Sequence, residues 1–326
     1  MSTAIKVLAK PSGAARQQKI TEGDPTGNSD RRQPEPRSLA RICTDDVVEK
    51  LGLPHLKSGN EAKSFKLIND RDWNIATAEP TSETNFFVEG HSALSVVSAI
   101  GPKGSGKSTI LNRLARKIAF KTHTKDQFDL SHTTRGIDVH STHHRILVDS
   151  QPILSSTVLE QFINGQSKSH FTNLADPLTC CQMIDLQLVT FLIATCDYVV
   201  IVCDWLIDVH LLKLISSAIM MIGESNIRAK LVMFCEGNCV IKGDRFKKLV
   251  GGFLGKNLID KYFDSFEDLY SHVTPYSNEK LDLYSTDDQK FIGKNWLESC
   301  IKLWNVTIKS SSMFTDYAFQ LSETGL

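Results

Sequence analysis

The feature that most constrains the fold of this chain is the segment from Gly101 to Ser108, which reads GPKGSGKS. It matches the pattern G-x-x-x-x-G-K-[ST] in full. In such a loop the glycines let the backbone curl its N–H groups around a phosphate. The pattern is meaningful only when a buried strand precedes it and a helix follows it. It therefore predicts an α/β fold with a phosphate-binding loop.

The residues on both sides of the loop meet this requirement. Residues 94–100 (LSVVSAI) are a short apolar run typical of a buried parallel strand, and residues 107–119 have a helical pattern. Further strands are expected at 145–149, 198–204 and 229–236, and further helices at 183–196, 207–222, 243–254 and 288–304. Apolar strands that alternate with helices favour a mainly parallel sheet with helices on both faces. The predicted fold class is α/β, of the P-loop NTPase type.

Composition excludes several classes of protein. Among the 326 residues, 37 Lys and Arg balance 37 Asp and Glu, so no global field draws the chain to nucleic acid or to an anionic membrane. Several of the 8 cysteines lie in apolar runs, which indicates reduced core thiols and a cytosolic or nuclear compartment, of which we predict the cytoplasmic one. Charged residues interrupt the most hydrophobic region, 198–222, so no membrane span is expected.

The chain is expected to divide into four parts. Residues 1–41 are rich in Pro, Gly, Gln, Ser and charge, and they are predicted to be a disordered tail. Basic residues outnumber acidic ones in this tail, which permits weak contact with RNA or with a partner. Residues 42–90 are expected to hold a short helix and an irregular lead-in. The P-loop domain spans 91–310, and 311–326 form a C-terminal tail.

The residues expected to bind a nucleotide are Lys103, Gly104, Ser105, Gly106, Lys107, Ser108 and Thr109. Lys107 would reach the β- and γ-phosphate oxygens, and the Ser108 hydroxyl would bind Mg²⁺. Asp149 ends an apolar strand and would hold Mg²⁺ through water. Thr134, between a helix and a strand, is a further Mg²⁺ candidate; the alternative for this segment is a plain turn at Arg135-Gly136.

Two features of ordinary GTP-dependent switches are missing. Pro152 stands three residues after Asp149, where such switches have a glycine whose N–H contacts the γ-phosphate, and proline has no N–H. The guanine-reading pattern NKxD is also absent after strand 229–236, where Asn238 is only a weak candidate. These departures predict very weak or no hydrolysis. They leave the nucleotide open between GDP or GTP and ADP or ATP.

Two of the expected helices, 183–196 and 207–222, are apolar around more than one face. A helix that covers a sheet needs only one apolar stripe. The surplus apolar surface, which is the part beyond that one stripe, must contact either another part of this chain, such as 41–90, or a partner protein. The residues chosen to test this surplus are Phe191, Ile193, Met220 and Met221.

Together these segments resemble the G-domain-like SMG subunits of the nonsense-mediated mRNA decay pathway. The likeness rests on LSVVSAI followed by GPKGSGKST at 101–109, on TTRGID at 133–138, on LVDSQPIL at 147–154, and on the low-complexity N-terminal tail. It covers about residues 90–310. The phosphate loop is shared by many families, whereas VDSQP in place of the usual DxxG is much more particular.

The resemblance implies a nucleotide-binding, G-domain-like fold and a stable heterodimer with a second G-domain-like SMG factor. It also implies association with the PI3K-like kinase of the decay pathway, which the pair restrains. The chain would then be a nucleotide-binding regulatory subunit of that kinase complex. An active NTPase switch of the GTPase type is the alternative function.

Overall fold

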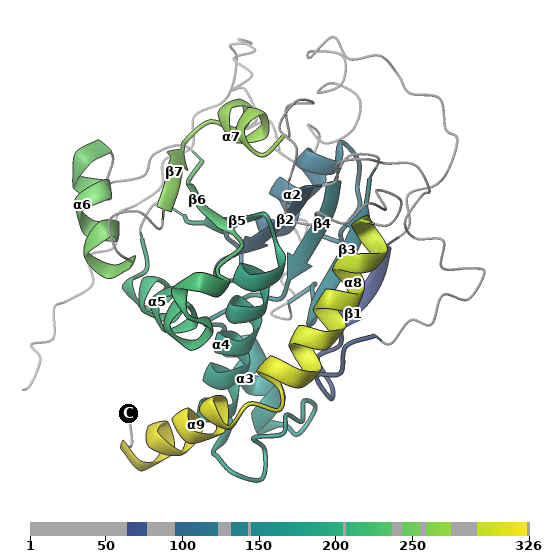
Figure 1. Ribbon diagram of the computed structural model, residues 1–326, viewed down its shortest axis with the longest axis vertical. Helices are drawn as coiled ribbons and strands as arrows, with labels where there is room; N and C mark the ends of the chain where they lie inside the picture. The colour runs from purple at the N-terminus through teal and green to yellow at the C-terminus, as the bar shows by residue number, and fades with distance from the viewer. Residues whose placement is uncertain are drawn as a thin grey trace, which may run out of the picture. The chain divides into compact units, whose positions relative to one another are not determined.

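The computed structural model describes residues 64–76, 95–122, 132–142, 145–204, 207–236, 243–254, 259–274 and 292–324. The tail predicted at 1–41, the short helix predicted after it, and Asn238 lie outside these residues. A sheet of seven strands runs through the described part, in the order β1-β3-β4-β2-β5-β6-β7 (Figure 1).

Five parallel strands form the larger part of this sheet. The strand before the phosphate loop, β2 (Ser95–Ile100), lies between β4 (Arg145–Ser150) and β5 (Tyr198–Val202) and is parallel to both. Beyond β5 the sheet continues with β6 (Lys230–Phe234) and β7 (Ile259–Phe263), again in parallel. The mainly parallel sheet predicted from the sequence is confirmed.

Two antiparallel strands complete the sheet on the other side of β4. Strand β3 (Ile137–Ser141) pairs antiparallel with β4, and β1 (Ser64–Ile68) pairs antiparallel with β3. The sequence analysis missed both strands, as well as β7. They are five-residue segments that include polar side chains such as Asp138 and His140, so no continuous apolar run marks them.

Helices cover both faces of the sheet, as expected. On one face α2 (Lys107–Ala115) and α7 (Phe266–His272) pack on a cluster that includes Val97, Val200 and Val232. The residues that alternate with these along the strands point to the other face. The phosphate-loop helix α2 is therefore held against the strand that leads into its loop.

Helix α4 (Pro177–Thr195) is the central helix of the other face (Figure 1). It begins after Asp176, whose side chain accepts hydrogen bonds from the N–H groups of Leu178 and Thr179. It is long and apolar enough to cross a membrane, but 83% of its most apolar stretch is buried within the protein. Its apolar surface is therefore used in the core.

The remaining helices of this face surround α4. On its sides lie α3 (Ser156–Ile163) and α5 (Val209–Ile222), and α6 (Gly243–Leu254) contacts α5. Helix α8 (Ile292–Lys302), the π-helical segment η3 (Leu303–Ile308) and helix α9 (Ser312–Thr324) also contact α4. Most of the segment expected as a C-terminal tail is thus a helix.

Aromatic residues near the C-terminus cover the surplus apolar surface of α4. Trp304 of η3 lies edge-to-face on Phe191, with ring centroids 5.4 Å apart, and its indole N–H donates to the carbonyl of Trp73 at 3.0 Å. Trp296 of α8 donates to the carbonyl of Thr195 at 2.9 Å. The cover therefore comes mainly from residues 292–324, with Trp73 contributing from the lead-in.

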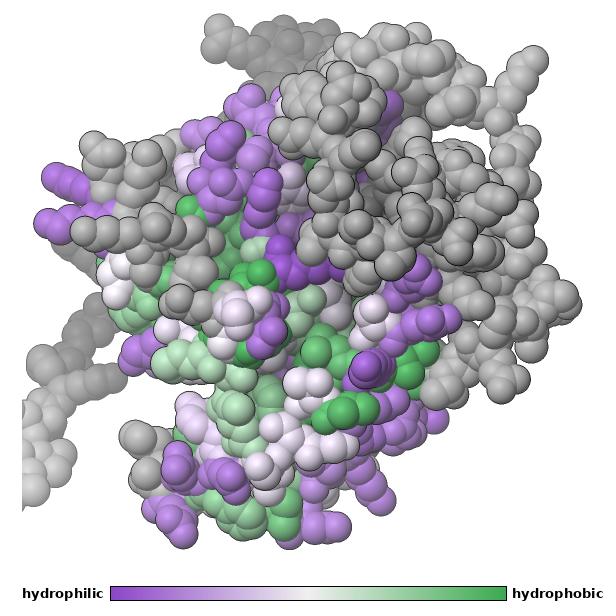
Figure 2. All heavy atoms as spheres, viewed as in Figure 1, coloured by the Kyte–Doolittle hydropathy of each residue, from purple (hydrophilic) through white to green (hydrophobic). Residues whose placement is uncertain are grey.

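The four residues chosen to test the apolar surplus have different positions in the structure. Phe191 and Ile193 are fully buried, whereas Met220 is 71% exposed and Met221 is half-buried. On the face drawn in Figure 2, apolar and polar residues are interspersed. For α4 the structure therefore favours the first of the two alternatives, a cover within this chain, although the cover comes mainly from residues 292–324 and not from 41–90.

Candidate phosphate-binding site

The loop 101–106 joins β2 directly to α2, as the motif requires. Gly101 has a φ of +154°, and a Cβ there would lie 2.5 Å from the carbonyl oxygen of Val202, so a larger residue would clash with the β5 backbone. Among the described residues, no side chain caps the start of α2. The N–H groups of its first turn therefore remain available for an anion, at the positive end of the helix dipole.

A cavity of about 160 Å³ lies over this loop. It is lined by six of the residues predicted to bind nucleotide, namely Lys103, Gly104, Gly106, Lys107, Ser108 and Thr109. Ser105 does not line it. From outside the loop, Pro152 and the segment from His132 to Thr134 also contribute.

The three residues predicted to bind Mg²⁺ lie together beside this cavity. The hydroxyls of Ser108 and Thr134 both donate to Asp149 Oδ2, at 2.8 Å and 2.7 Å, and the two hydroxyl oxygens are 3.4 Å apart. Asp149 is fully buried, and its Oδ1 has no hydrogen-bond partner among the described residues. Hydroxyl and carboxylate oxygens are the ligands that Mg²⁺ prefers, so this donor set fits the ion.

Burial perturbs both charged groups of the site. Desolvation lowers the pKa of Lys107 to about 8, while nearby Asp149 opposes the change. Desolvation raises the pKa of Asp149 to about 6, against the hydrogen bonds from Thr134 and Ser108 and the charge of Lys107. Lys107 remains protonated at neutral pH, and its Nζ donates to the carbonyl of Pro102 at 2.9 Å. A cation held out of water in this way is suited to bind phosphate oxygens.

The residues that follow Asp149 are tied to the neighbouring loops. The N–H of Gln151 donates to the carbonyl of Gly136 at 2.8 Å, and the Gly136 N–H donates to Gln151 Oε1 at 3.0 Å. The next N–H along the chain, that of Ile153, donates to the carbonyl of Gly101 at 3.3 Å. The buried Gln151 side chain therefore joins two loops, and its carbonyl oxygen does not orient a water molecule at a phosphate.

A buried carboxylate in α4 holds the end of the same loop. Asp185 is 1% exposed, and its Oδ2 accepts a hydrogen bond from the N–H of Leu154 at 2.8 Å. Burial raises the pKa of Asp185 from its usual 3.8 to about 7. Because the folded state binds this proton more tightly than the unfolded state, the free energy of unfolding should fall as pH rises from about 4 to about 7.

The variant Asp185→Asn tests this dependence, since an amide oxygen still accepts from Leu154 but cannot ionise. We expect the variant to gain stability over the wild type at pH 8, and the gain to shrink at pH 5. Denaturant unfolding at the two pH values measures both, with the exposed Asp268→Asn as the control. If the free energies of unfolding of the variant and the wild type differ by the same amount at pH 5 and at pH 8, the raised pKa of Asp185 is contradicted.

The sequence analysis missed His132, a further residue of the cavity. Its side chain is 4% exposed, and Nδ1 lies 3.0 Å from Thr157 Oγ1. Burial, helped by the positive charges of Arg135, Lys103 and Lys107, lowers the pKa of His132 to about 4, and the charge of Asp70 opposes the change. The only sequence signal was a histidine just before TTRG, which without the fold did not indicate a binding residue.

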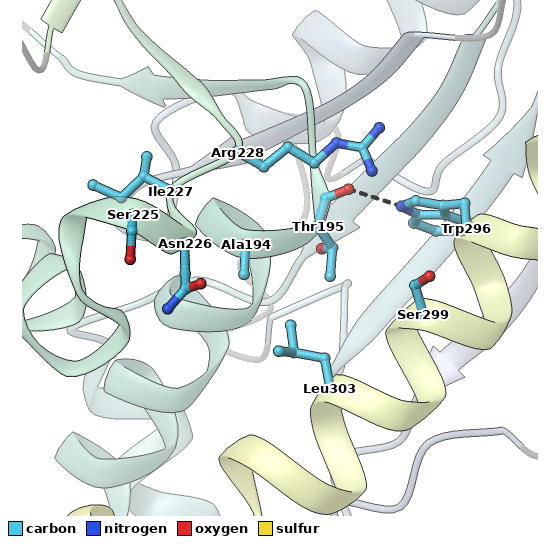
Figure 3. Close-up of a pocket in the computed structure, with 9 residues that line it drawn as sticks. All are labelled: Ala194, Thr195, Ser225, Asn226, Ile227, Arg228, Trp296, Ser299 and Leu303. Atoms are coloured by element: carbon cyan, nitrogen blue, oxygen red, sulfur yellow. Dashed lines mark hydrogen bonds between the residues drawn. The ribbon is translucent and has the colours of Figure 1, made fainter. Parts of the chain in front are cut away.

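A second, larger cavity of about 320 Å³ lies between the end of α4, the segment 225–228 and α8 (Figure 3). It is next to the starts of β5 and β6, whereas the phosphate loop follows the end of β2. Its charged residue, Arg228, donates from Nε and Nη2 to Asp197 Oδ1 at 3.0 Å and 2.7 Å. The Trp296 indole points to the Thr195 carbonyl. These polar groups already serve to join elements of the fold.

Comparison with known proteins gives matches in sequence and in structure, although no family model matches the chain. It is 31% identical over 170 residues to the nonsense-mediated mRNA decay factor SMG9 of Salmo salar, covering 48% of this chain and 32% of that protein. It is 33% identical over 137 residues to SMG9 of Xenopus laevis, covering 39% and 27%. With SMG9 of Caenorhabditis elegans it shares 28% identity over 192 residues, covering 53% and 46%.

Among solved structures, a GTP-binding protein from Sulfolobus solfataricus in complex with GDP matches 55% of this chain and 51% of its own, at 14% identity and a TM-score of 0.30. A score this low does not establish a common fold. The sequence matches are more specific, although they span less than half the length of each SMG9 protein. They confirm the resemblance seen in the motifs, and this chain is a relative of the nonsense-mediated mRNA decay factors SMG9.

Proposed function

We propose that this chain is a nucleotide-binding regulatory subunit of the nonsense-mediated mRNA decay machinery. The observation that carries the nucleotide-binding role is the convergence of Ser108, Thr134 and Asp149 next to the loop that holds Lys107. These residues come from α2, β4 and the loop before β3, and the fold brings their side chains together. The similarity to SMG9 supports the role in decay.

In this proposal each residue of the site has a defined role. Lys107 and the N–H groups at the start of α2 bind the β- and γ-phosphate oxygens. Ser108 and Thr134 bind Mg²⁺ directly, and Asp149 holds it through water. The bound ion neutralises phosphate charge. The loop residues from Lys103 to Thr109 surround the phosphates.

We propose GDP or GTP as the nucleotide because the sequence resembles G-domain-like proteins, with ADP or ATP as the alternative. The segment that would read the base follows β6 and includes Asn238, which lies outside the described residues.

The proposed partners are a second G-domain-like SMG factor, as a heterodimer, and the PI3K-like kinase of the pathway, which the pair restrains. The similarity to SMG9 is the support for them, since the apolar residues of α4 are covered within this chain. In this role the protein acts in the cytoplasm and needs no membrane. RNA contact is indirect, or weak through the basic tail.

Identification of the copurifying nucleotide tests the proposed function. The full chain would be purified with Mg²⁺, denatured, and the released nucleotide separated by chromatography against standards of GDP, GTP, ADP and ATP. We expect up to one guanine nucleotide per chain. A chain that releases no nucleotide and binds none of the four in a titration would overturn the proposal.

Hydrolysis by the isolated chain should be very slow. Pro152 has no N–H to donate to a γ-phosphate, and the Gln151 carbonyl oxygen is bonded to Gly136. Single-turnover rates with GTP and with ATP measure this, and we expect values far below about 1 s⁻¹. The variant Gln151→Ala should hydrolyse at the wild-type rate. Rates near 1 s⁻¹, or a large loss of rate in that variant, would favour the active switch.

A further inference from the structure

His132 is a buried side chain of the phosphate cavity to which the proposed function assigns no role. It is 4% exposed and lines the cavity together with Lys103, Lys107 and Pro152. Its Nε2 is buried and has no hydrogen-bond partner in the part of the chain that the structure describes. Buried polar atoms are nearly always hydrogen-bonded, so an unpaired one next to a binding cavity points to a ligand.

The other ring nitrogen determines what Nε2 offers to such a ligand. Nδ1 lies 3.0 Å from Thr157 Oγ1, which lies 2.9 Å from Ser155 Oγ. When Ser155 donates to Thr157 and Thr157 donates to Nδ1, the imidazole proton is on Nε2. His132 then presents an N–H donor, which suits an anionic ligand such as phosphate.

The position of His132 suggests which phosphate it contacts. Pro152 occupies the place where switch proteins have an N–H for the terminal phosphate, and both residues line the same cavity. His132 is also two residues before Thr134, on the loop that completes the Mg²⁺ cluster. His132 therefore enters the cavity from the loop that carries Thr134, and not from the phosphate loop that binds the inner phosphates.

We propose that His132 is a nucleotide-binding residue whose Nε2–H donates to the terminal phosphate of a nucleoside triphosphate, in place of the backbone donor that Pro152 lacks. This inference rests on the proposed function, because it needs a nucleotide in this cavity. It makes His132 a specificity-determining residue that favours triphosphate over diphosphate. The phosphate-loop residues of the proposed site would bind both.

Two substitutions and a matched control test this role. His132→Leu removes the donor, whereas His132→Gln keeps an N–H donor of similar reach. His140 is the control, because it is 2% exposed, has one ring nitrogen bonded to Ser64 and the other unpaired among the described residues, and does not line the cavity. His140→Leu therefore reports the cost of losing a buried histidine elsewhere in the same domain.

The measurement is a calorimetric titration of the full chain and its variants with GDP and with GMP-PNP, a non-hydrolysable GTP analogue. Inorganic pyrophosphate and tripolyphosphate serve as probes without a base. A hydrogen bond to a charged oxygen makes a large contribution to binding. We expect His132→Leu to lose about tenfold or more in affinity for GMP-PNP and tripolyphosphate, and less than threefold for GDP and pyrophosphate. His132→Gln should recover part of the loss, and His140→Leu should bind all four as the wild type does.

The results separate this inference from the proposed function. A wild type that binds none of the four probes, and neither ADP nor ATP, overturns both. A wild type that binds them, with a His132→Leu variant that weakens diphosphate and triphosphate equally or neither of them, overturns the role of His132 alone. Circular dichroism of each variant before titration confirms folding, and His132→Gln carries the test if His132→Leu does not fold. In that case, the role is contradicted if the wild type prefers triphosphate but His132→Gln, which keeps an N–H donor, binds triphosphate and diphosphate with equal affinity.

Discussion

Replacing Lys107 by alanine should weaken nucleotide binding at least tenfold, or by about 1.4 kcal/mol. Lys107 is 7% exposed and supplies a positive charge next to the cavity, so its contact with a phosphate oxygen would be charge-assisted and partly desolvated. The N–H groups of the loop remain in the variant, which is why binding should weaken without being lost entirely. Titration of the full chain with GDP and GTP measures the effect.

A neighbouring cation on the same helix provides the control for this prediction. Arg113 of α2 pairs with Glu236 at 2.7 Å and lies over the ring of Phe266, outside the residues that line the cavity. Arg113→Ala should therefore leave the affinity unchanged. Equal affinities of Lys107→Ala and the wild type would show that this loop does not bind the phosphates.

Replacing Gly136 by alanine should lower the free energy of unfolding by about 3 kcal/mol or more. Gly136 has a φ of +68°, a conformation that costs an alanine free energy, and a Cβ there would lie 2.1 Å from the carbonyl oxygen of Ile68. Backbone atoms cannot be moved as easily as a flexible side chain, so β1 would have to shift. The bonds between Gly136 and Gln151 would be disturbed as well.

A second glycine separates the clash from the conformational cost. Gly165 has a nearly identical φ of +66°, but a Cβ there would meet no atom of the described residues within 4 Å. The free energy of unfolding of Gly165→Ala should therefore fall by only about 1 kcal/mol. Urea unfolding of both variants measures the difference between them. If Gly136→Ala and Gly165→Ala lose equal amounts of unfolding free energy, the close approach of Gly136 to β1 is contradicted.

Several elements were predicted well, including the strand that leads into the phosphate loop. The strand expected at 94–100 is β2 (Ser95–Ile100), and the helix expected at 243–254 is α6 with the same bounds. The strands expected at 145–149 and 229–236 are β4 and β6 within two residues at each end. Continuous apolar runs and a loop motif are local signals, and they determine these elements without reference to the rest of the chain.

The elements that were missed depend on pairing with distant residues. Strand β1 joins β3 across more than seventy positions of sequence, with Ser64 opposite His140. Its pattern of exposed and buried residues gives no clear alternation. Such an edge strand is stabilised by its partner and by burial of residues such as Leu67 and Ile68, and its own sequence carries little of that information.

The cover of the apolar helices was also beyond the sequence. Phe191 and Ile193 look the same in the sequence as residues of an interface, because both kinds of site use large apolar side chains. The structure buries them, Phe191 against Trp304 more than one hundred positions away. Only Met220, at 71% exposure, retains the position that the interface hypothesis required.

By itself the sequence determined the fold class and predicted the phosphate loop, the lysine expected at the phosphates, and the three oxygen ligands Ser108, Thr134 and Asp149, because these predictions follow from a motif, from a strand end, or from a segment between a helix and a strand. The tertiary structure alone decided that these three oxygens meet at one carboxylate, that Gln151 bonds to Gly136, and that His132 lines the same cavity. The reason is physical: a motif constrains the backbone over a few neighbouring residues, whereas a contact between side chains on different loops depends on how the whole sheet and its helices pack.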